Sequence, residues 1–117
     1  MEQSKIKSLV IKNNPNAPKD KKRAIAFFLM DNGKTIKRKF GYFGSKGTYF
    51  DGASDEKRNA YIARHKVRED FNDVFSAGSL SRYALWEFRS RNEIEKFYNR
   101  KFKIPKVKVQ ITKQKLE

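Results

Sequence analysis

The clearest hydrophobic pattern in the chain is an apolar run at residues 24–30, followed by a short polar stretch and an alternating run at residues 35–42. Every position of the first run is apolar, which is typical of a strand covered on both faces. In the second run, Lys37 and Lys39 point away from the apolar side chains. Asn32-Gly33 lies between the runs and fits a type I′ turn, in which both central residues have positive φ. The pattern predicts a β-hairpin with one face packed on the rest of the chain and a lysine-lined outer strand.

Two further segments, one on each side of the hairpin along the chain, have a strand-like pattern. Residues 5–12 contain isoleucine, leucine and valine and predict a short strand. A loop rich in asparagine and proline at residues 13–18 connects this strand to the hairpin. Residues 106–113 alternate with period two, so the apolar side chains face one way and the lysines the other. This alternation fits an edge strand whose lysines protect its outer side, and it fits equally an arm that becomes ordered on a partner.

The middle of the chain has helical periodicity. Ser54 is suited to cap a helix that ends at residues 72–73, because its hydroxyl can accept a hydrogen bond from the first turn. The apolar side chains that recur at helical spacing predict its buried stripe. They are Ala60, Ala63, Val67 and Phe71.

Two shorter helices are expected after the first one. Residues 80–88 are apolar on nearly all sides and predict a second helix. Residues 90–93 have the pattern of a capping box and open a third helix, which Pro105 ends. The third helix has an apolar stripe made of Ile94, Phe97, Tyr98 and Phe102.

These elements predict an α+β fold, with a small antiparallel sheet built on an N-terminal hairpin and two or three helices packed against it. We expect a single α+β domain at residues 1–104. Residues 105–117 are expected to form a basic C-terminal arm or edge strand.

The net charge of +15 says more about partners than about the fold. Residues 1–50 carry 12 Lys and Arg against 3 acids, residues 51–88 carry 6 against 7, and residues 89–117 carry 10 against 3. The excess therefore lies at the two ends, and it would attract nucleic acid, an anionic membrane surface or an acidic protein. The expected role of these cations is to pair with phosphate or carboxylate without reading bases. The candidate polyanion-binding residues are Lys19, Lys21, Lys22, Arg23, Lys37, Arg38, Lys39, Lys101, Lys103, Lys106 and Lys108.

Residues 43–52 mix glycines with aromatic side chains, and two interpretations stay open for each group. The glycines around Lys46 can form a backbone nest for a phosphate, or they can simply mark turns. The aromatic residues can stack on an unpaired base, or they can belong to the core. The aromatic residues concerned are Tyr42, Phe43, Tyr49 and Phe50.

Several classes of chemistry are not supported by the residues present. The chain has no cysteine, so it has neither disulfides nor thiolate metal sites, and no segment is long and apolar enough to span a bilayer. His65 is the only histidine. It can be imagined as the general base of a small nuclease with a carboxylate-bound metal, yet no catalytic motif accompanies it. We expect no enzyme activity, no cofactor, no metal site and no small-molecule substrate.

Residues 43–86 contain a series of motifs in order and with few gaps: Phe43-Gly44-Ser45-Lys46-Gly47, Tyr49, Asp51, Asp55, Arg58, Tyr61-Ile62, Arg64-His65, Glu69-Asp70-Phe71, Ser76-Ala77-Gly78, Leu80-Ser81-Arg82-Tyr83 and Leu85-Trp86. With these motifs the segment resembles a family of short basic proteins encoded by nucleocytoplasmic large DNA viruses, the giant viruses of algae and amoebae. The sequence differs from the family pattern at Phe71 and Tyr83, where the family usually has tryptophan. The resemblance implies a viral origin and a small domain that follows a β-hairpin, and it implies no catalytic residues.

Together, charge and resemblance lead to one expected function and two alternatives. The leading hypothesis is a non-enzymatic structural protein of a large DNA virus particle, either a minor capsid protein or a genome-packaging protein. Its basic flanks would bind acidic capsid proteins or DNA, and it would be found in the virion and, during infection, in the host cytoplasm or viral factory. The second hypothesis is a nucleic-acid-binding protein that acts in viral replication or transcription, and the third is a small nuclease.

Overall fold

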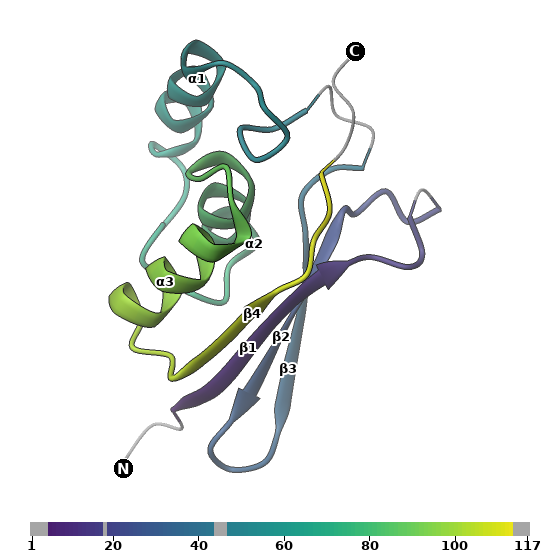
Figure 1. The fold of residues 1–117 in the computed structure, drawn as a ribbon, viewed down its shortest axis with the longest axis vertical. Coiled ribbons are helices and arrows are strands. Elements are labelled where there is room, and N and C mark those ends of the chain that lie inside the picture. The colour runs from purple at the N-terminus through teal and green to yellow at the C-terminus, as the bar shows by residue number, and fades with distance from the viewer. Residues whose placement is uncertain (1–4, 18, 44–46, 114–117) are drawn as a thin grey trace.

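The computed structural model describes residues 5–17, 19–43 and 47–113, which form a four-stranded sheet with helices on one side (Figure 1). The predicted α+β class is confirmed. The strands are β1 (Ile6–Asn13), β2 (Ala24–Met30), β3 (Thr35–Phe40) and β4 (Lys106–Val109). The helices are α1 (Asp55–His65), α2 (Ala77–Ser81) and α3 (Arg91–Lys101), and the π-helical segment η1 (Arg82–Trp86) continues α2.

The sheet has the order β3-β2-β1-β4 and is mixed, whereas the sequence predicted an antiparallel sheet. β1 pairs antiparallel with β2 and β2 pairs antiparallel with β3, but β4 pairs parallel with β1. The helices carry the chain back to the end of the sheet at which β1 begins, and such a crossover produces a parallel neighbour. Lys106–Val109 of the C-terminal segment therefore form an edge strand of the sheet, one of the two forms expected for that segment.

The turn between β2 and β3 is of a different type from the predicted one. Gly33 has a φ of +86°, but Asn32 does not have positive φ. The N–H of Gly33 donates to the carbonyl of Met30 at 3.0 Å, and the N–H of Met30 donates to the carbonyl of Lys34 at 2.8 Å. This is the three-residue hairpin loop in which a turn is followed by one left-handed glycine. The predicted hairpin is confirmed, and the predicted type I′ turn is wrong.

The first helix begins as predicted and then departs from the prediction. The Ser54 hydroxyl accepts a hydrogen bond from the N–H of Lys57, but the helix ends at His65. Ala60, Ala63 and Val67 are exposed, Val67 by 75%, so this part of the predicted apolar stripe does not face the core. Phe71, which lies beyond the end of the helix, packs against the core as predicted. Tyr61 is the buried residue of the helix instead, with its ring stacked on Trp86 at 4.4 Å between centroids. The large aromatic ring, rather than the row of alanines, determines which side of α1 packs inward.

The later helices follow their capping signals. α2 begins at residue 77, earlier than predicted, because the Ser76 hydroxyl accepts a hydrogen bond from the N–H of Ser79 at 3.1 Å. The predicted cap at the start of α3 is confirmed, because the Ser90 hydroxyl accepts from the N–H of Glu93. The Glu93 carboxylate accepts from that hydroxyl, whereas in a capping box it accepts from the backbone N–H of the capping residue. The predicted stripe of α3 is also confirmed, with Tyr98 fully buried.

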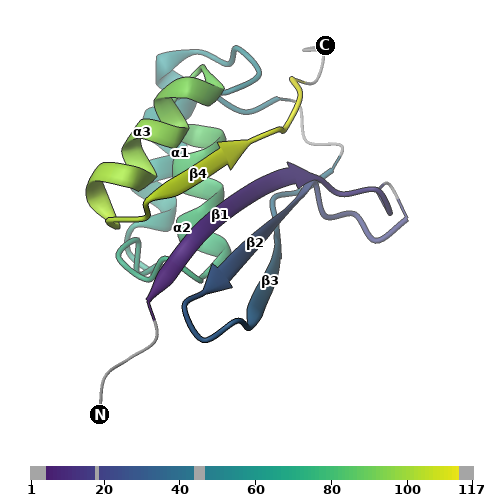
Figure 2. The same cartoon turned by 60° about the horizontal axis from the view of Figure 1, so that its bottom comes forward.

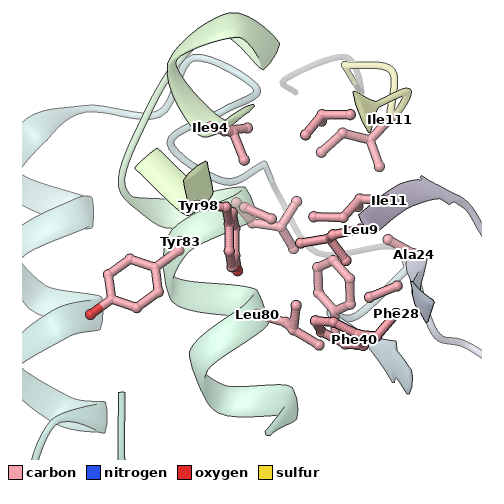
Figure 3. Close-up of a cluster of buried hydrophobic side chains, with 14 of the residues drawn as sticks. Leu9, Ile11, Ala24, Phe28, Phe40, Leu80, Tyr83, Ile94, Tyr98 and Ile111 are labelled. Carbon is pink, nitrogen blue, oxygen red and sulfur yellow. The ribbon is translucent and has the colours of Figure 1, made fainter. Parts of the chain in front are cut away.

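The core lies between the helices and the inner face of the sheet (Figure 3). Large side chains from the strands meet large side chains from the helices, and the buried phenol of Tyr98 has a pKa raised by desolvation. The fully buried side chains shown there include Leu9, Ile11, Phe28, Phe40, Leu80, Ile94, Tyr98 and Ile111.

Candidate polyanion interface

The face of the sheet that points away from the helices is uncovered by any helix of the described chain (Figure 2). Leu9 and Ile11 of β1 point into the core, so the alternate residues of each strand point outward. The strand register then shows which outward residues lie side by side. We call this surface the open face. It is formed by Ser8, Val10, Lys12, Ile25, Phe27, Leu29, Thr35, Lys37, Lys39, Lys106 and Lys108, and of these Ile25 is only 4% exposed.

The open face is strongly basic, because it holds five lysines and none of the residues that form it is acidic. Lys12, Lys37, Lys106 and Lys108 are exposed. The register places Lys37 and Lys108 in one row across the four strands, at opposite edges of the sheet. Neighbouring strands lie about 4.8 Å apart, so this row is roughly 14 Å wide.

Lys39 differs from the other lysines of the open face because it has an acidic partner. Its ammonium group pairs with Asp20 at 2.7 Å. The hydrogen bond from Lys39, followed by one from Asn14, lowers the pKa of Asp20 to about 2. This ion pair lies at the boundary between the open face and the β1–β2 connection, and it offsets one of the five positive charges.

The structure brings together two of the predicted groups that are far apart in the sequence. Lys37 and Lys39 come from the hairpin, and Lys106 and Lys108 come from β4, yet all four point to the open face. Arg38 is exposed but lies on the other face of β3, opposite Ala26. Its guanidinium donates to the backbone carbonyl of Lys37 at 3.1 Å.

The basic residues of the predicted cluster at residues 19–23 differ in their exposure to solvent. Lys19, Lys21 and Lys22 are exposed in the connection between β1 and β2. Arg23 is only 3% exposed, and its guanidinium makes two hydrogen bonds to the carboxylate of Asp51, at 2.6 and 2.7 Å. It therefore acts inside the fold, where it is not available to a polyanion, and this corrects its assignment as a surface cation.

Lys101 and Lys103 lie apart from the open face, at the C-terminal end of α3. The ammonium group of Lys101 donates to the side chain of Asn72 at 3.1 Å. Lys103 has a φ of +57° and lines a groove of about 460 Å³ with Ile6, Phe75 and other residues. The second predicted cluster is thus split, with only its β4 members on the open face.

The aromatic residues proposed for base stacking have different environments. Phe50 is 1% exposed and belongs to the core, whereas Tyr42 is 58% exposed. The ring of Tyr49 is covered by the guanidinium of Arg89 at 4.2 Å. Phe43 is half-buried. The predicted phosphate nest falls on residues 44–46, which lie outside the described residues.

Phe27 is an aromatic residue of the open face that sequence reasoning did not select. It lies in β2, between Lys37 of β3 and Val10 of β1 in the register, and it is half-buried. The only sequence feature that could have pointed to Phe27 is its place in a run that is apolar at every position. That run predicted a strand covered on both faces, whereas helices cover one face and leave Leu29 37% exposed on the other.

His65 lines a groove of about 470 Å³ between α1, α2 and the segment after β3. Its ring stacks on Tyr61 at 4.1 Å, and its Nδ1 lies 4.0 Å from the carboxylate of Glu69. That separation is longer than the hydrogen bond that orients an acid–base pair. Among the residues that the structure describes, no group of three or more His, Cys, Asp and Glu side chains is arranged to hold a metal ion.

Comparisons with protein families, with curated proteins and with solved structures found no match to this chain. In the described ranges, none of the helices has both the length and the apolar character that crossing a bilayer requires.

Proposed function

We propose that this protein binds nucleic acid without catalysing a reaction on it, as a component of a large DNA virus particle. The observation that carries the proposal is the gathering of five lysines from β1, β3 and β4 on one uncovered face that contains no acidic residue. Such a surface attracts the phosphate backbone irrespective of sequence. The virus particle as the setting is taken from the resemblance of residues 43–86 to short basic proteins of giant viruses.

The open face supports a nucleic-acid partner better than the groove at His65 supports catalysis. Phosphates repeat at short intervals along a strand, and the open face offers lysines at several points across its width rather than one isolated cation. Pairing with many phosphates releases counterions, so the affinity should fall steeply as salt is added.

The proposal is tested by replacing Lys37, Lys106 and Lys108 together with glutamine and measuring nucleic-acid affinity over a range of salt concentrations. All three side chains are exposed, so the fold should survive the substitutions. Each phosphate contact contributes about 0.7 to 0.9 to the slope of log affinity against log salt, so the slope should become about 2 smaller in magnitude.

A matched control removes the same charge from the helical side of the molecule. Lys57, Lys66 and Lys96 are exposed and lie in or next to α1 and α3. Their replacement with glutamine should change the slope much less, although the net charge falls equally. Equal effects of the two triple variants would overturn the assignment of the open face. Retention of an acidic protein, with no nucleic-acid binding, would favour the alternative of a capsid-binding protein.

A further inference from the structure

The centre of the open face is apolar, although its margins are basic. Val10, Phe27 and Leu29 project from the two central strands, and Leu29 is 37% exposed. Lys37 and Lys108 lie at the two ends of the row that contains Phe27. The arrangement is thus a partly exposed aromatic ring with cations on both sides of it.

A nucleic-acid duplex exposes no base face that could pack on the apolar centre of the open face. Its bases are stacked inside the helix, and its outer surface offers mainly phosphates, which lysines can bind without an aromatic side chain beside them. A single strand presents the flat faces of its bases together with its phosphates. Proteins that bind single strands combine a basic surface with aromatic side chains on which bases stack.

The contact between Lys12 and Phe27 is compatible with such stacking. The ammonium group of Lys12 lies 5.9 Å from the centroid of the Phe27 ring, near the outer limit of a cation–π contact. Lys12 is exposed and has a long flexible side chain, so a base can displace it. The displaced ammonium group then remains close enough to pair with a phosphate of the same strand.

We infer that the open face binds single-stranded nucleic acid, with one base stacked on Phe27 and the neighbouring phosphates paired with Lys12, Lys37 and Lys108. This inference rests on the proposed function and specifies its substrate class. The inference explains the apolar centre of the open face, which phosphate binding by the lysines does not explain.

The first test compares Phe27→Leu with the unchanged protein by fluorescence anisotropy, using labelled oligo(dT), a duplex of equal length and heparin. Leucine keeps an apolar side chain in β2 but removes the ring. The affinity for oligo(dT) should fall about tenfold, within the range measured when stacking residues are truncated, and the affinities for duplex and heparin should stay unchanged. Phe27→Tyr keeps an aromatic ring and should bind oligo(dT) as tightly as the unchanged protein does. Thermal unfolding checks the fold of each variant.

Tyr42 provides a matched control, because its ring is 58% exposed but lies outside the open face. Tyr42→Leu should leave the oligo(dT) affinity unchanged. A loss for Tyr42→Leu that equals the loss for Phe27→Leu would overturn the placement of the base on Phe27.

A second measurement detects stacking directly. In Phe27→Trp, the fluorescence of the new indole should be quenched by oligo(dT) and not by heparin. The fluorescence of Trp86, measured in the unchanged protein, is subtracted. Binding of all three polyanions, with no selective effect at Phe27 and no quenching, would overturn the inference and leave the proposed function standing. Failure to bind either nucleic acid would overturn both.

Discussion

Arg23 and its neighbour Lys22 carry the same charge in opposite environments. Lys22 is exposed, whereas the guanidinium of Arg23 lies inside the fold between Asp51, the hydroxyl of Thr48 and the carbonyl of Thr112. A planar guanidinium can bind a carboxylate with two parallel hydrogen bonds, which an ammonium group cannot. This side chain therefore connects β2 to the loop before α1 and to the segment after β4.

We predict that Arg23→Met lowers the free energy of unfolding by about 3–5 kcal/mol, because it leaves the carboxylate of Asp51 buried without its cation. Lys22→Met removes the same charge from the surface and should cost less than about 0.5 kcal/mol. Urea unfolding followed by circular dichroism measures both values. If the two variants were equally stable, Arg23 would not have the structural role described here.

The ion pair between Asp20 and Lys39 predicts a pH dependence of stability. The pKa of Asp20 is lowered from 3.8 to about 2 in the folded protein, so the unfolded chain binds the proton first as the pH falls. The stabilisation is therefore complete above about pH 4 and is lost as the pH falls through about 2. The difference in unfolding free energy between the unchanged protein and Asp20→Asn should be present at pH 6 and should shrink towards pH 2.

Lys39→Gln removes the first partner of Asp20 and should give a similar pH profile. Urea unfolding at a series of pH values measures the profiles. A difference between the unchanged protein and Asp20→Asn that stayed constant from pH 6 to pH 2 would contradict the lowered pKa.

At the scale of the elements, capping residues were better guides than apolar spacing. The hydroxyl groups of Ser54 and Ser90 set the starts of α1 and α3, and both starts were predictable because a cap depends on local hydrogen bonds. The buried side of α1 was not predictable from its alanines. That side is set by the contact between Tyr61 and Trp86, which come from different helical segments.

We predict that Trp86→Ala lowers the free energy of unfolding by about 3 kcal/mol, at the lower end of the range for truncating a large aromatic side chain. Trp86 is half-buried and packs almost parallel to Tyr61, with an angle of 6° between the rings. His65→Ala removes the other ring that stacks on Tyr61 and should cost less than about 1.5 kcal/mol. Urea unfolding compares the two, and an equal cost would mean that Trp86 does not anchor α1.

At the scale of the whole molecule, the sequence predicted the components of the candidate site better than their assembly. Lys37 and Lys39 were correctly placed on one side of their strand, because alternation with period two is a local property. The meeting of these lysines with Lys106 and Lys108 depends on the strand order, which no local pattern specifies. Phe27 was overlooked for a related reason, since a fully apolar strand does not indicate which face the helices will cover.

Because β4 pairs with β1, the open face combines residues from the two ends of the chain and is complete only when both are present. Asn13, the last residue of β1, and Thr112, which follows β4, are 99 positions apart and are joined by hydrogen bonds. Contacts between such distant segments form late, because closing a long loop costs entropy before any contact offsets it. A nascent polypeptide that has been synthesised only as far as the hairpin contains three of the five lysines, Lys12, Lys37 and Lys39, and lacks the two that β4 adds. If the proposed function holds, the full affinity for a polyanion should arise only after β4 has been synthesised, so incomplete copies should compete little with finished ones.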